Sequence, residues 1–575
     1  MTVSSATSTG TTAVSTPSSS TTATTSTPTG ATTNPSGIDW NALIQSQVAA
    51  KLAAATTVET SITSNQAKIT AYQQMQTLLS TLATSALPFS SSNTSSLSSS
   101  AFSASTAAIT ANGDVSPSSV IGMSVNNGAP SGSYTLTIDQ IAQAQKVAGT
   151  SVASQSTALG YGGVFSIGLV GSASANITVT SGMTLQDLVN TINAQDSTTN
   201  VQASIVQISS TQFEMVLTGT QDGVDIATTS VSGDNVLNKL GVTDGSGNFS
   251  DQVQKAQSAI ITLDGIEITR NTNDISDVLS NTTFHLYQPT PAGTSLDIAI
   301  SPDTSQISTA LQTLVTSYNA YRDFVTAQQQ TGSDGTAASG TVLFGDGTMN
   351  DIMNQLQDAM NTTVGGLSLN DLGLSFTSTN DLQLNTTTLQ TALTDNLPGV
   401  EALLATQATT SSGDLTTIAA GNAAPSPFTL DVAVDGSGNL VSASVGGDSS
   451  LFTISGNTIL GNAGTPYAGM AFDYTGTTSQ SITVTTTPGI ASLLNGIATS
   501  ASDPTTGSLQ SLVSGLQTQD TTLQQQVTDI QAQASDYQTQ LQAQYAQYQA
   551  AIQEATTTLT YLQSLLNATT QSGVG

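Results

Sequence analysis

The C-terminal heptad repeat constrains the fold of this chain more than any other feature. Large apolar side chains recur there at every seventh position, a spacing that aligns them along one seam of an α-helix. The pattern predicts a helix of about 60 residues, roughly 90 Å long at 1.5 Å per residue. A helix of this length cannot bury its apolar stripe alone, so it requires a partner. The stripe comprises Leu509, Leu516, Leu523, Ile530 and Tyr537, joined by Val527, Ala534, Leu541 and Tyr548, and continues through Tyr545, Ile552, Leu559 and Leu566.

A second long helix is predicted near the N-terminus. Asp39 is placed to cap it, the helix continues to about Leu87, and Pro88 ends it. Large side chains again follow steps of three and four, with the amides of Asn65 and Gln76 in two seam positions. These side chains are Val58, Ile62, Ile69, Tyr72 and Leu79. The two ends of the chain are therefore expected to pack together as a stalk.

The C-terminal helix is rich in glutamine and has four acidic residues and no basic ones. Opposite charges beside the seam, which fix partners in many coiled coils, are therefore missing. This composition favours a polar, adjustable interface. From the periodicity alone, a bundle within one chain and a contact with another subunit or a filament are equally supported.

The middle of the chain alternates between β and helical patterns. Strands are expected over most of residues 89–300, where Thr, Val and Ile alternate with small polar residues, as in Tyr134–Ile138, Ala175–Thr180, Val201–Ile208 and Ala259–Thr269. Two short helices are predicted among them, at Thr184–Ala194 and Asn273–Leu279. Helical periodicity returns after Asp303 and again from Met349, and residues 425–487 alternate once more.

The predicted fold class is multidomain α+β, with long terminal α-helices packed as a coiled-coil stalk and helical bundle, and antiparallel β-rich head domains in the middle of the chain. Residues 1–36 are mainly Ser, Thr, Ala, Pro and Gly without charge, which predicts a disordered leader. The predicted segments are the leader (1–36), an N-terminal stalk helix (37–88), β-rich head domains (89–303), a helical bundle domain (304–424), an inserted small β unit (425–489) and a C-terminal stalk coiled coil (490–575).

Charge argues against nucleic acid as a partner. The chain has 7 Lys and Arg against 37 Asp and Glu, a formal net charge of -30, and no basic residue follows Arg322. Phosphate binding needs clustered cations, and anionic membrane surfaces need them too. No segment approaches the roughly 18 to 20 apolar residues that span a bilayer, and the N-terminus lacks the pattern of a cleaved signal peptide.

The composition also argues against catalysis. The chain has no cysteine and one histidine, His285, so nucleophilic triads and histidine-rich metal centres have few candidate members. The sequence DGSGN occurs at Asp244–Asn248 and Asp435–Asn439, where a hairpin turn is favoured over a calcium loop because Asp-Gly suits tight turns. We therefore predict no catalytic residue, no cofactor and no metal site.

Several ordered blocks resemble the flagellar cap family, also called hook-associated protein 2. The blocks with the most specific pattern are ITLDGIEITRNTNDISDVLSNTTFHL at Ile261–Leu286 and SYNAYRDFV at Ser317–Val325. The others are the opening helix at Gly37–Leu82, YTLTIDQIAQAQ, TLQDLVNTIN, LFGDGTMNDI, LNDLGLSFTSTNDLQLN and GTPYAGMAFDYTG. Within the two most specific blocks, Asp264, Gly265, Arg270, Asn273, Tyr318 and Asn319 form a structural motif. Asp264-Gly265 is expected to turn the chain, and Arg270 to pair with a carboxylate across a domain junction.

The resemblance implies a secreted, extracellular, non-enzymatic assembly factor at the tip of the flagellum. It implies a homo-oligomeric ring, often of five subunits, whose stalk helices contact the filament while exported flagellin folds and polymerises beneath it. The flagellar export apparatus and an export chaperone are the further partners that it implies. A surface adhesin, or another hook-associated or flagellin-like filament protein, is the alternative.

Overall fold

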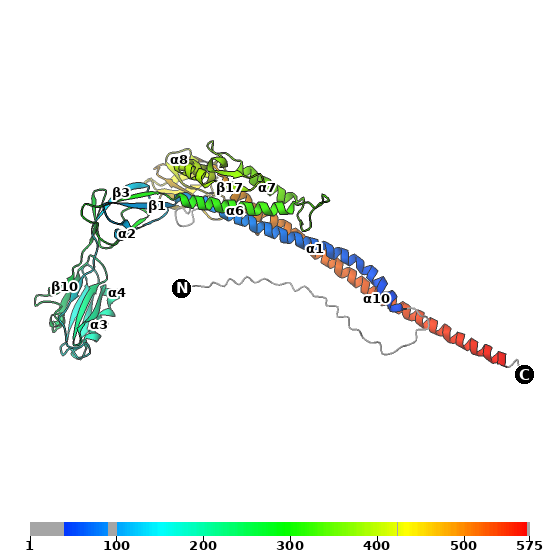
Figure 1. Ribbon diagram of the computed structural model, residues 1–575, viewed down its shortest axis with the longest axis horizontal. Helices are drawn as coiled ribbons and strands as arrows, with labels where there is room; N and C mark the ends of the chain where they lie inside the picture. The colour runs from blue at the N-terminus through cyan, green and yellow to red at the C-terminus, as the bar shows by residue number, and fades with distance from the viewer. Residues whose placement is uncertain (1–38, 90–99, 422–423, 572–575) are drawn as a thin grey trace. The chain divides into compact units, whose positions relative to one another are not determined.

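The computed structural model describes residues 39–89, 100–421 and 424–571, with side chains described up to residue 568. The predicted leader therefore lies outside the described residues. The chain divides into two units, one of residues 1–67 and 515–575 and the other of residues 68–514, and each is described by itself. Figure 1 shows the order of elements along the chain by colour.

The first unit consists of parts of two long helices. Helix α1 covers Trp40–Ala86 and helix α10 covers Ser508–Gln571, with 47 and 64 residues respectively. The Asp39 carboxylate accepts a hydrogen bond from the backbone N–H of Ala42 at 3.0 Å, as the predicted cap requires. Both predicted terminal helices are confirmed, and with them the α+β fold class with antiparallel sheets between the helical ends.

The second unit begins its β structure with a five-stranded antiparallel sheet in the order β1-β15-β3-β11-β12 and a three-stranded sheet in the order β13-β14-β2. Alternate side chains of these strands share one core, which includes Leu136, Ile261, Phe284 and Ile298. The predicted alternation is thus confirmed as a sheet with one buried face. The strands are β1 (Ser105–Asn112), β2 (Ile121–Val125), β3 (Gly132–Gln140), β11 (Ala259–Leu263), β12 (Ile266–Arg270), β13 (Asp274–Ile275), β14 (Thr282–Leu286) and β15 (Ser295–Pro302), and the short helix α2 (Pro117–Val120) precedes β2.

Residues 146–254 build a second β region with its own core. One sheet has the order β10-β4-β8-β7 and the other β6-β5-β9. The predicted helix at Thr184 is present as α3 (Leu185–Asn193), and Thr184 forms a capping box with Asp187. The other elements are β4 (Lys146–Ala148), β5 (Gly163–Leu169), β6 (Ser174–Val179), α4 (Asp196–Thr199), β7 (Val201–Ser209), β8 (Gln212–Gly219), β9 (Ile226–Gly233), α5 (Val236–Lys239) and β10 (Asp251–Gln254).

Helices return after Asp303, which accepts a hydrogen bond from the Ser305 N–H at the start of α6. The helices are α6 (Thr304–Gln328), α7 (Gly347–Met360), α8 (Thr386–Leu404) and α9 (Ile490–Ser502), and the hairpin β16 (Leu374–Phe376) and β17 (Leu382–Leu384) lies between α7 and α8 in sequence. Between α8 and α9 come two four-stranded sheets, in the orders β18-β25-β20-β21 and β19-β24-β23-β22, which share one apolar core. Their strands are β18 (Gln407–Thr410), β19 (Leu415–Ala420), β20 (Phe428–Val434), β21 (Leu440–Ser444), β22 (Phe452–Ser455), β23 (Thr458–Gly461), β24 (Met470–Tyr474) and β25 (Gln480–Thr487).

The helix predicted at Asn273–Leu279 is wrong. Asp274 and Ile275 instead form strand β13, paired with His285 and Phe284 of β14. Ile275 is 1% exposed, so strand pairing places it in the core. The Asn273 side chain, which was expected to cap the helix, binds the backbone of Ala142 instead. Because the Asn273 amide is engaged by this distant residue, its oxygen is not available to cap a helix at this position.

In the described part of the chain, no helix is both long and apolar enough to cross a membrane.

Candidate functional site

The two terminal helices run antiparallel within the first unit (Figure 1). Near the start of α1, the Trp40 ring lies 5.0 Å from that of Tyr545, and further along α1 Asn65 contacts Asp520. Residue numbers thus rise along α1 as they fall along α10. Ile44, Leu541 and Tyr545 form a buried cluster with partly buried side chains around it. The stripe predicted from the heptads therefore has α1 of the same chain as one partner.

Polar contacts interrupt this seam at two levels. The Gln47 amide donates to the Tyr545 hydroxyl at 3.1 Å and accepts from the Tyr537 hydroxyl at 3.0 Å. The Asn65 amide donates to the Asp520 carboxylate at 2.8 Å, and these residues are only 8% and 6% exposed. Of the seam amides noted in the sequence, Asn65 thus has a buried carboxylate as its partner, and Gln76, in the second unit, donates to the Gln510 amide oxygen at 3.4 Å. Buried polar pairs of this kind favour one register over others at a cost in stability.

The predicted seam residues differ in burial. Within the first unit, Leu541 is buried and most of the others are half-buried, whereas Leu559 is 57% exposed. In the second unit, Tyr72 and Leu79 are buried and Ile69 is half-buried. The half-buried members of the first unit are Val58, Ile62, Leu516, Leu523, Ile530, Tyr537 and Ile552.

Helix α10 continues beyond its contacts with α1. The described part of α1 begins next to Tyr545, and α10 continues from there to Gln571. Apart from the half-buried Ile552, large side chains of this continuation are exposed: Leu559 by 57%, Tyr561 by 64%, Leu562 by 58% and Leu566 by 65%. The heptad stripe therefore extends past the point where the described residues of this chain cover it.

Tyr72 makes a contact that the heptad pattern did not predict. Its hydroxyl donates to the Asp346 carboxylate at 2.5 Å, and the same carboxylate caps α7 by accepting from the Met349 N–H at 2.8 Å. Burial raises the pKa of Tyr72 above its ordinary value of 10.0, and the hydrogen bond to the negatively charged Asp346 raises this pKa further. Asp346 therefore fixes the start of α7 against α1, and only the Asp-Gly-Thr-Met cap signal marked it in the sequence.

Asp264 and Gly265 form the tight turn of the β11–β12 hairpin, as expected. Both have positive φ angles, 50° and 82°, which glycine and aspartate tolerate better than most residues. The Asp264 carboxylate also accepts from the Thr135 N–H at 2.8 Å. It thereby holds the turn against β3.

Asn273 and Arg270 have different kinds of partner. The Asn273 amide binds both backbone groups of Ala142, accepting at 2.7 Å and donating at 2.9 Å, much as a neighbouring strand would. Arg270 pairs with Asp277 at 2.9 Å through its Nε. The prediction that this carboxylate lies across a domain junction is wrong, because Asp277 is seven residues further along the same segment.

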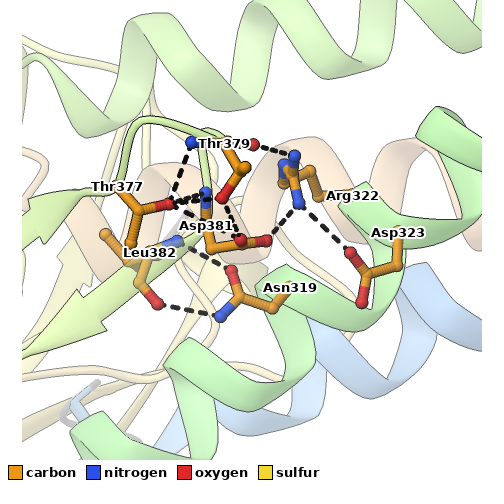
Figure 2. Close-up of polar contacts among 7 residues, drawn as sticks. All are labelled: Asn319, Arg322, Asp323, Thr377, Thr379, Asp381 and Leu382. Carbon is orange, nitrogen blue, oxygen red and sulfur yellow. Dashed lines mark hydrogen bonds and ion pairs between the residues drawn. The ribbon is translucent and has the colours of Figure 1, made fainter.

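The second structural cluster joins α6 to the β16–β17 hairpin (Figure 2). Asn319 accepts from the Leu382 N–H at 2.9 Å and donates to the Leu382 carbonyl at 2.8 Å. One turn further, the Arg322 guanidinium binds the Asp381 carboxylate and the Thr379 carbonyl. The two side chains together hold the hairpin on the helix.

Arg322 was not among the predicted site residues. Its side chain is 13% exposed, against 38% for Arg270, so its ion pair is far better shielded from water. The available signal was its rarity, because it is the last basic residue in a chain that has seven. Tyr318, which was predicted, is fully buried, and burial raises the pKa of its hydroxyl to about 12.

His285 and the two DGSGN segments, the candidates for catalysis or metal binding in the sequence, make hydrogen bonds that stabilise strands and turns. His285 lies in β14, and its ring nitrogens contact Asp274 at 2.6 Å and Ser124 at 3.0 Å. Both DGSGN segments form the predicted turns, in which Asp244 and Asp435 each accept from two backbone N–H groups within the turn. Among the described residues, no group of three or more His, Cys, Asp or Glu side chains is arranged to hold a metal ion.

Comparisons with known families match most of this chain. The model of the flagellar hook-associated protein 2 C-terminus matches residues 256–557, which is more than half of the chain. The model of the N-terminus of the same family matches residues 36–145, and the flagellin hook IN motif matches residues 164–221.

Among individual relatives, flagellar hook-associated protein 2 of Escherichia coli K12 is 29% identical over 391 residues, which cover 64% of this chain and 78% of that protein. The B-type protein of Pseudomonas aeruginosa is 24% identical over 300 residues, 49% of this chain and 63% of that protein.

Among solved structures, the D1-D2-D3 domains of the Escherichia coli flagellar cap protein FliD match with a TM-score of 0.46 and 24% identity, covering 58% of this chain and 90% of that one. The model of the C-terminus alone covers the β11–β12 hairpin, the Asn319–Arg322 cluster and most of α10. On the strength of the two terminal family models, this chain belongs to the flagellar hook-associated protein 2 family.

Proposed function

We propose that this chain caps the growing flagellar filament. Copies of it form a homo-oligomeric ring at the filament tip, outside the cell, and the ring promotes the folding and polymerisation of exported flagellin. The observation that carries this proposal is the stripe of α10, which pairs with the described part of α1 as far as Tyr545 and then continues to Leu566, exposed except at the half-buried Ile552. An exposed helical stripe of this kind needs helices from other molecules to cover it.

The predicted seam residues fall into two groups for this function. Val58, Ile62, Leu523 and Ile530 hold α1 and α10 together within one subunit, because they are half-buried on the two helices of the first unit. Ile552 and Leu559 lie beyond Tyr545 and contact neighbouring subunits or the filament. Leu516, Tyr537 and Leu541 complete the first group, whereas Ile69, Tyr72 and Leu79 belong to the second unit.

The polar character of the seam suits a cap that shifts each time a subunit is added. Its contacts include amide–hydroxyl hydrogen bonds, each of which contributes about 0.5–1.5 kcal/mol net, and one amide–carboxylate hydrogen bond, which contributes about 1.5–3 kcal/mol. Such contacts can break singly without separating the whole helix pair. A seam of leucines alone would bind more tightly but would specify the register less.

The proposed partners are further copies of this chain, five in the complete ring, together with flagellin, the flagellar export apparatus and an export chaperone. Shape and polar contacts do the work, and no covalent chemistry is required. The structural motif residues Asp264, Gly265, Asn273 and Asn319 act within the subunit by holding turns and hairpins in place.

Deletion of the gene in its source bacterium tests the proposal. Normal hooks without filaments in electron micrographs, together with monomeric flagellin in the medium, are expected. Complementation with the full chain should restore filaments, and a chain truncated after Tyr548 should not, because the exposed part of the stripe is then missing. Intact filaments with lost surface attachment would instead make this protein an adhesin and overturn the proposal.

A further inference from the structure

Strand β7 is an edge strand whose own residues include none of the charges or prolines that commonly protect an edge, and its register with β8 shifts between Gln207 and Ser209. It lies at the end of the sheet β10-β4-β8-β7 and pairs only with β8 among the described strands. Its nine residues, VQASIVQIS, include no charged residue and no proline. Edge strands in soluble proteins commonly carry charges, prolines or covering loops that block pairing with another chain.

Side chains of the same chain cap the first half of this edge. The Thr199 hydroxyl binds both backbone groups of Val201, at 3.3 Å to its N–H and 3.4 Å to its carbonyl. The Asn193 amide likewise binds both backbone groups of Ala203, at 2.7 Å and 2.9 Å. At both positions a side chain takes the place that a further strand would occupy.

The second half of the edge is open. Backbone groups of alternate residues in a strand point to the same side, so Ile205 and Gln207 direct theirs outward, as Val201 and Ala203 do. None of the hydrogen bonds of the described residues reaches the outward N–H and C=O groups of Ile205 and Gln207. Ile205 and Gln207, two alternate residues, therefore offer the donor and acceptor pattern that an added strand requires.

Exposed apolar side chains flank this open half. Val206 is 48% exposed and Ile208 is 53% exposed, and they lie two residues apart on the same face of the strand. An added strand could place its own apolar side chains beside them and so bury both. The capped half of β7 has only Gln202 and Ser204 on this face, so the apolar and the open backbone positions coincide.

Charge around the edge distinguishes the kinds of partner. Val206 is directly opposite Glu214 on β8, and Asp196 lies near the capped end, where it accepts from the Gln202 amide at 3.3 Å. One carboxylate thus lies beside the capped end of β7, and the other lies opposite Val206 within the open half. A second copy of this chain, with its net charge of -30, would add like charge, whereas a neutral segment with basic ends would not.

We propose that the Ile205–Ser209 half of β7 binds an extended segment of another protein by strand addition. The segment has alternating apolar and small uncharged residues with a Lys or Arg at its ends. Backbone hydrogen bonds to Ile205 and Gln207 supply the register, and contacts with Val206 and Ile208 supply the side-chain preference. This proposal depends on the geometry of β7 and not on the capping function.

A labelled synthetic peptide tests this with the full chain. The probe has about eight residues, the length of an ordinary strand, with alternating valine and threonine and a lysine at each end. The control is the same peptide with N-methyl groups on alternate residues, which removes the donors that face the edge. Fluorescence anisotropy should show saturable binding of the first peptide and at least a roughly tenfold weaker binding of the second, because two or more hydrogen bonds are lost.

Matched variants locate the site. Gln207→Pro removes an outward N–H and leaves the ladder to β8 intact, so binding should weaken by roughly fivefold or more, whereas Gln207→Thr should bind like the parent chain. Val206→Ser should also weaken binding. Val231→Ser on β9, where the valine is 52% exposed, should not.

Equal binding of the plain and N-methylated peptides, or unchanged binding by both Val206→Ser and Gln207→Pro, would overturn the proposal. The peptide comparison stands even if the proline variant does not fold. A chain that ignores the peptide but forms dimers in sedimentation runs, lost in Val206→Ser, would show that a second copy occupies the edge and would also overturn it.

Discussion

Replacing Asn65 with leucine should weaken the pairing of the terminal helices. The Asn65 amide donates to the Asp520 carboxylate at 2.8 Å, and the two residues are 8% and 6% exposed. In the Asn65→Leu variant, the carboxylate stays buried without this donor. A buried polar group left without its partner costs about 1–3 kcal/mol, and more when it is charged. We therefore expect the free energy of unfolding of the helix pair to fall by about 1–3 kcal/mol.

Trp40 provides a direct assay because it is the only tryptophan in the chain. Its ring lies 5.0 Å from that of Tyr545, on the opposite helix of the same unit. Separation of the helices exposes the indole to water and shifts its fluorescence. A urea titration followed by tryptophan fluorescence therefore reports the helix pair and not the β domains. The urea concentration at the midpoint of unfolding should be lower for Asn65→Leu than for the parent chain.

The double variant Asn65→Leu/Asp520→Leu separates a buried-charge effect from a packing effect. Replacing both partners of a buried polar pair with apolar side chains is often neutral or stabilising, so its midpoint should return to that of the parent chain or exceed it. Gln45→Leu, at an exposed position of α1, is the control and should change little. A double variant that is as unstable as Asn65→Leu, or a single variant with an unchanged midpoint, would refute the reasoning.

Three further outcomes are expected. Leu523→Asp combined with Ile530→Asp should abolish swimming motility while the circular dichroism of the β domains stays unchanged, since both side chains are half-buried in the helix pair; normal motility would contradict this. Arg322→Met should lower the free energy of unfolding of the second unit by about 1–3 kcal/mol in thermal melts, because Asp381 and the Thr379 carbonyl lose their donor. The exposed pair of Arg270 should contribute less than about 1 kcal/mol, so Arg270→Met is the control. Burial raises the pKa of Tyr318 from 10.0 to about 12, so the folded state holds this proton more tightly than the unfolded chain; its contribution to stability should be complete below pH 10 and be lost as the pH rises through 12, as urea titrations at increasing pH would show.

Local signals predicted the elements well where the residues that form them are neighbours in sequence. Asp39, Thr184 and Asp303 mark helix starts because a cap needs only its own next three residues. The Asp264-Gly265 and DGSGN turns were predictable for the same reason. The failure at Asn273 has the opposite cause, because its amide binds Ala142, which is 131 residues away in sequence.

The candidate site shows the same division. The heptad spacing identified the stripe of α10, but it could not say which part of that stripe is covered within one chain. Only the structure pairs Asn65 with Asp520 and shows that the described residues of α1 cover the stripe as far as Tyr545. Arg322 and Asp346 were missed because their importance comes from partners on other elements, Asp381 and Tyr72.

The sequence alone determined the long terminal helices, the antiparallel β-rich middle and the acidic, cysteine-free character of the chain, because periodicity, capping and composition are properties of neighbouring residues. Tertiary structure decided which polar side chains become clamps and which edge of which sheet remains open. Thr199 and Asn193 cap half of β7 and leave Ile205 and Gln207 free, and no pattern within the strand itself distinguishes the two halves of its backbone. Hydrogen bonds between distant residues depend on how the chain returns upon itself, and that information is not local.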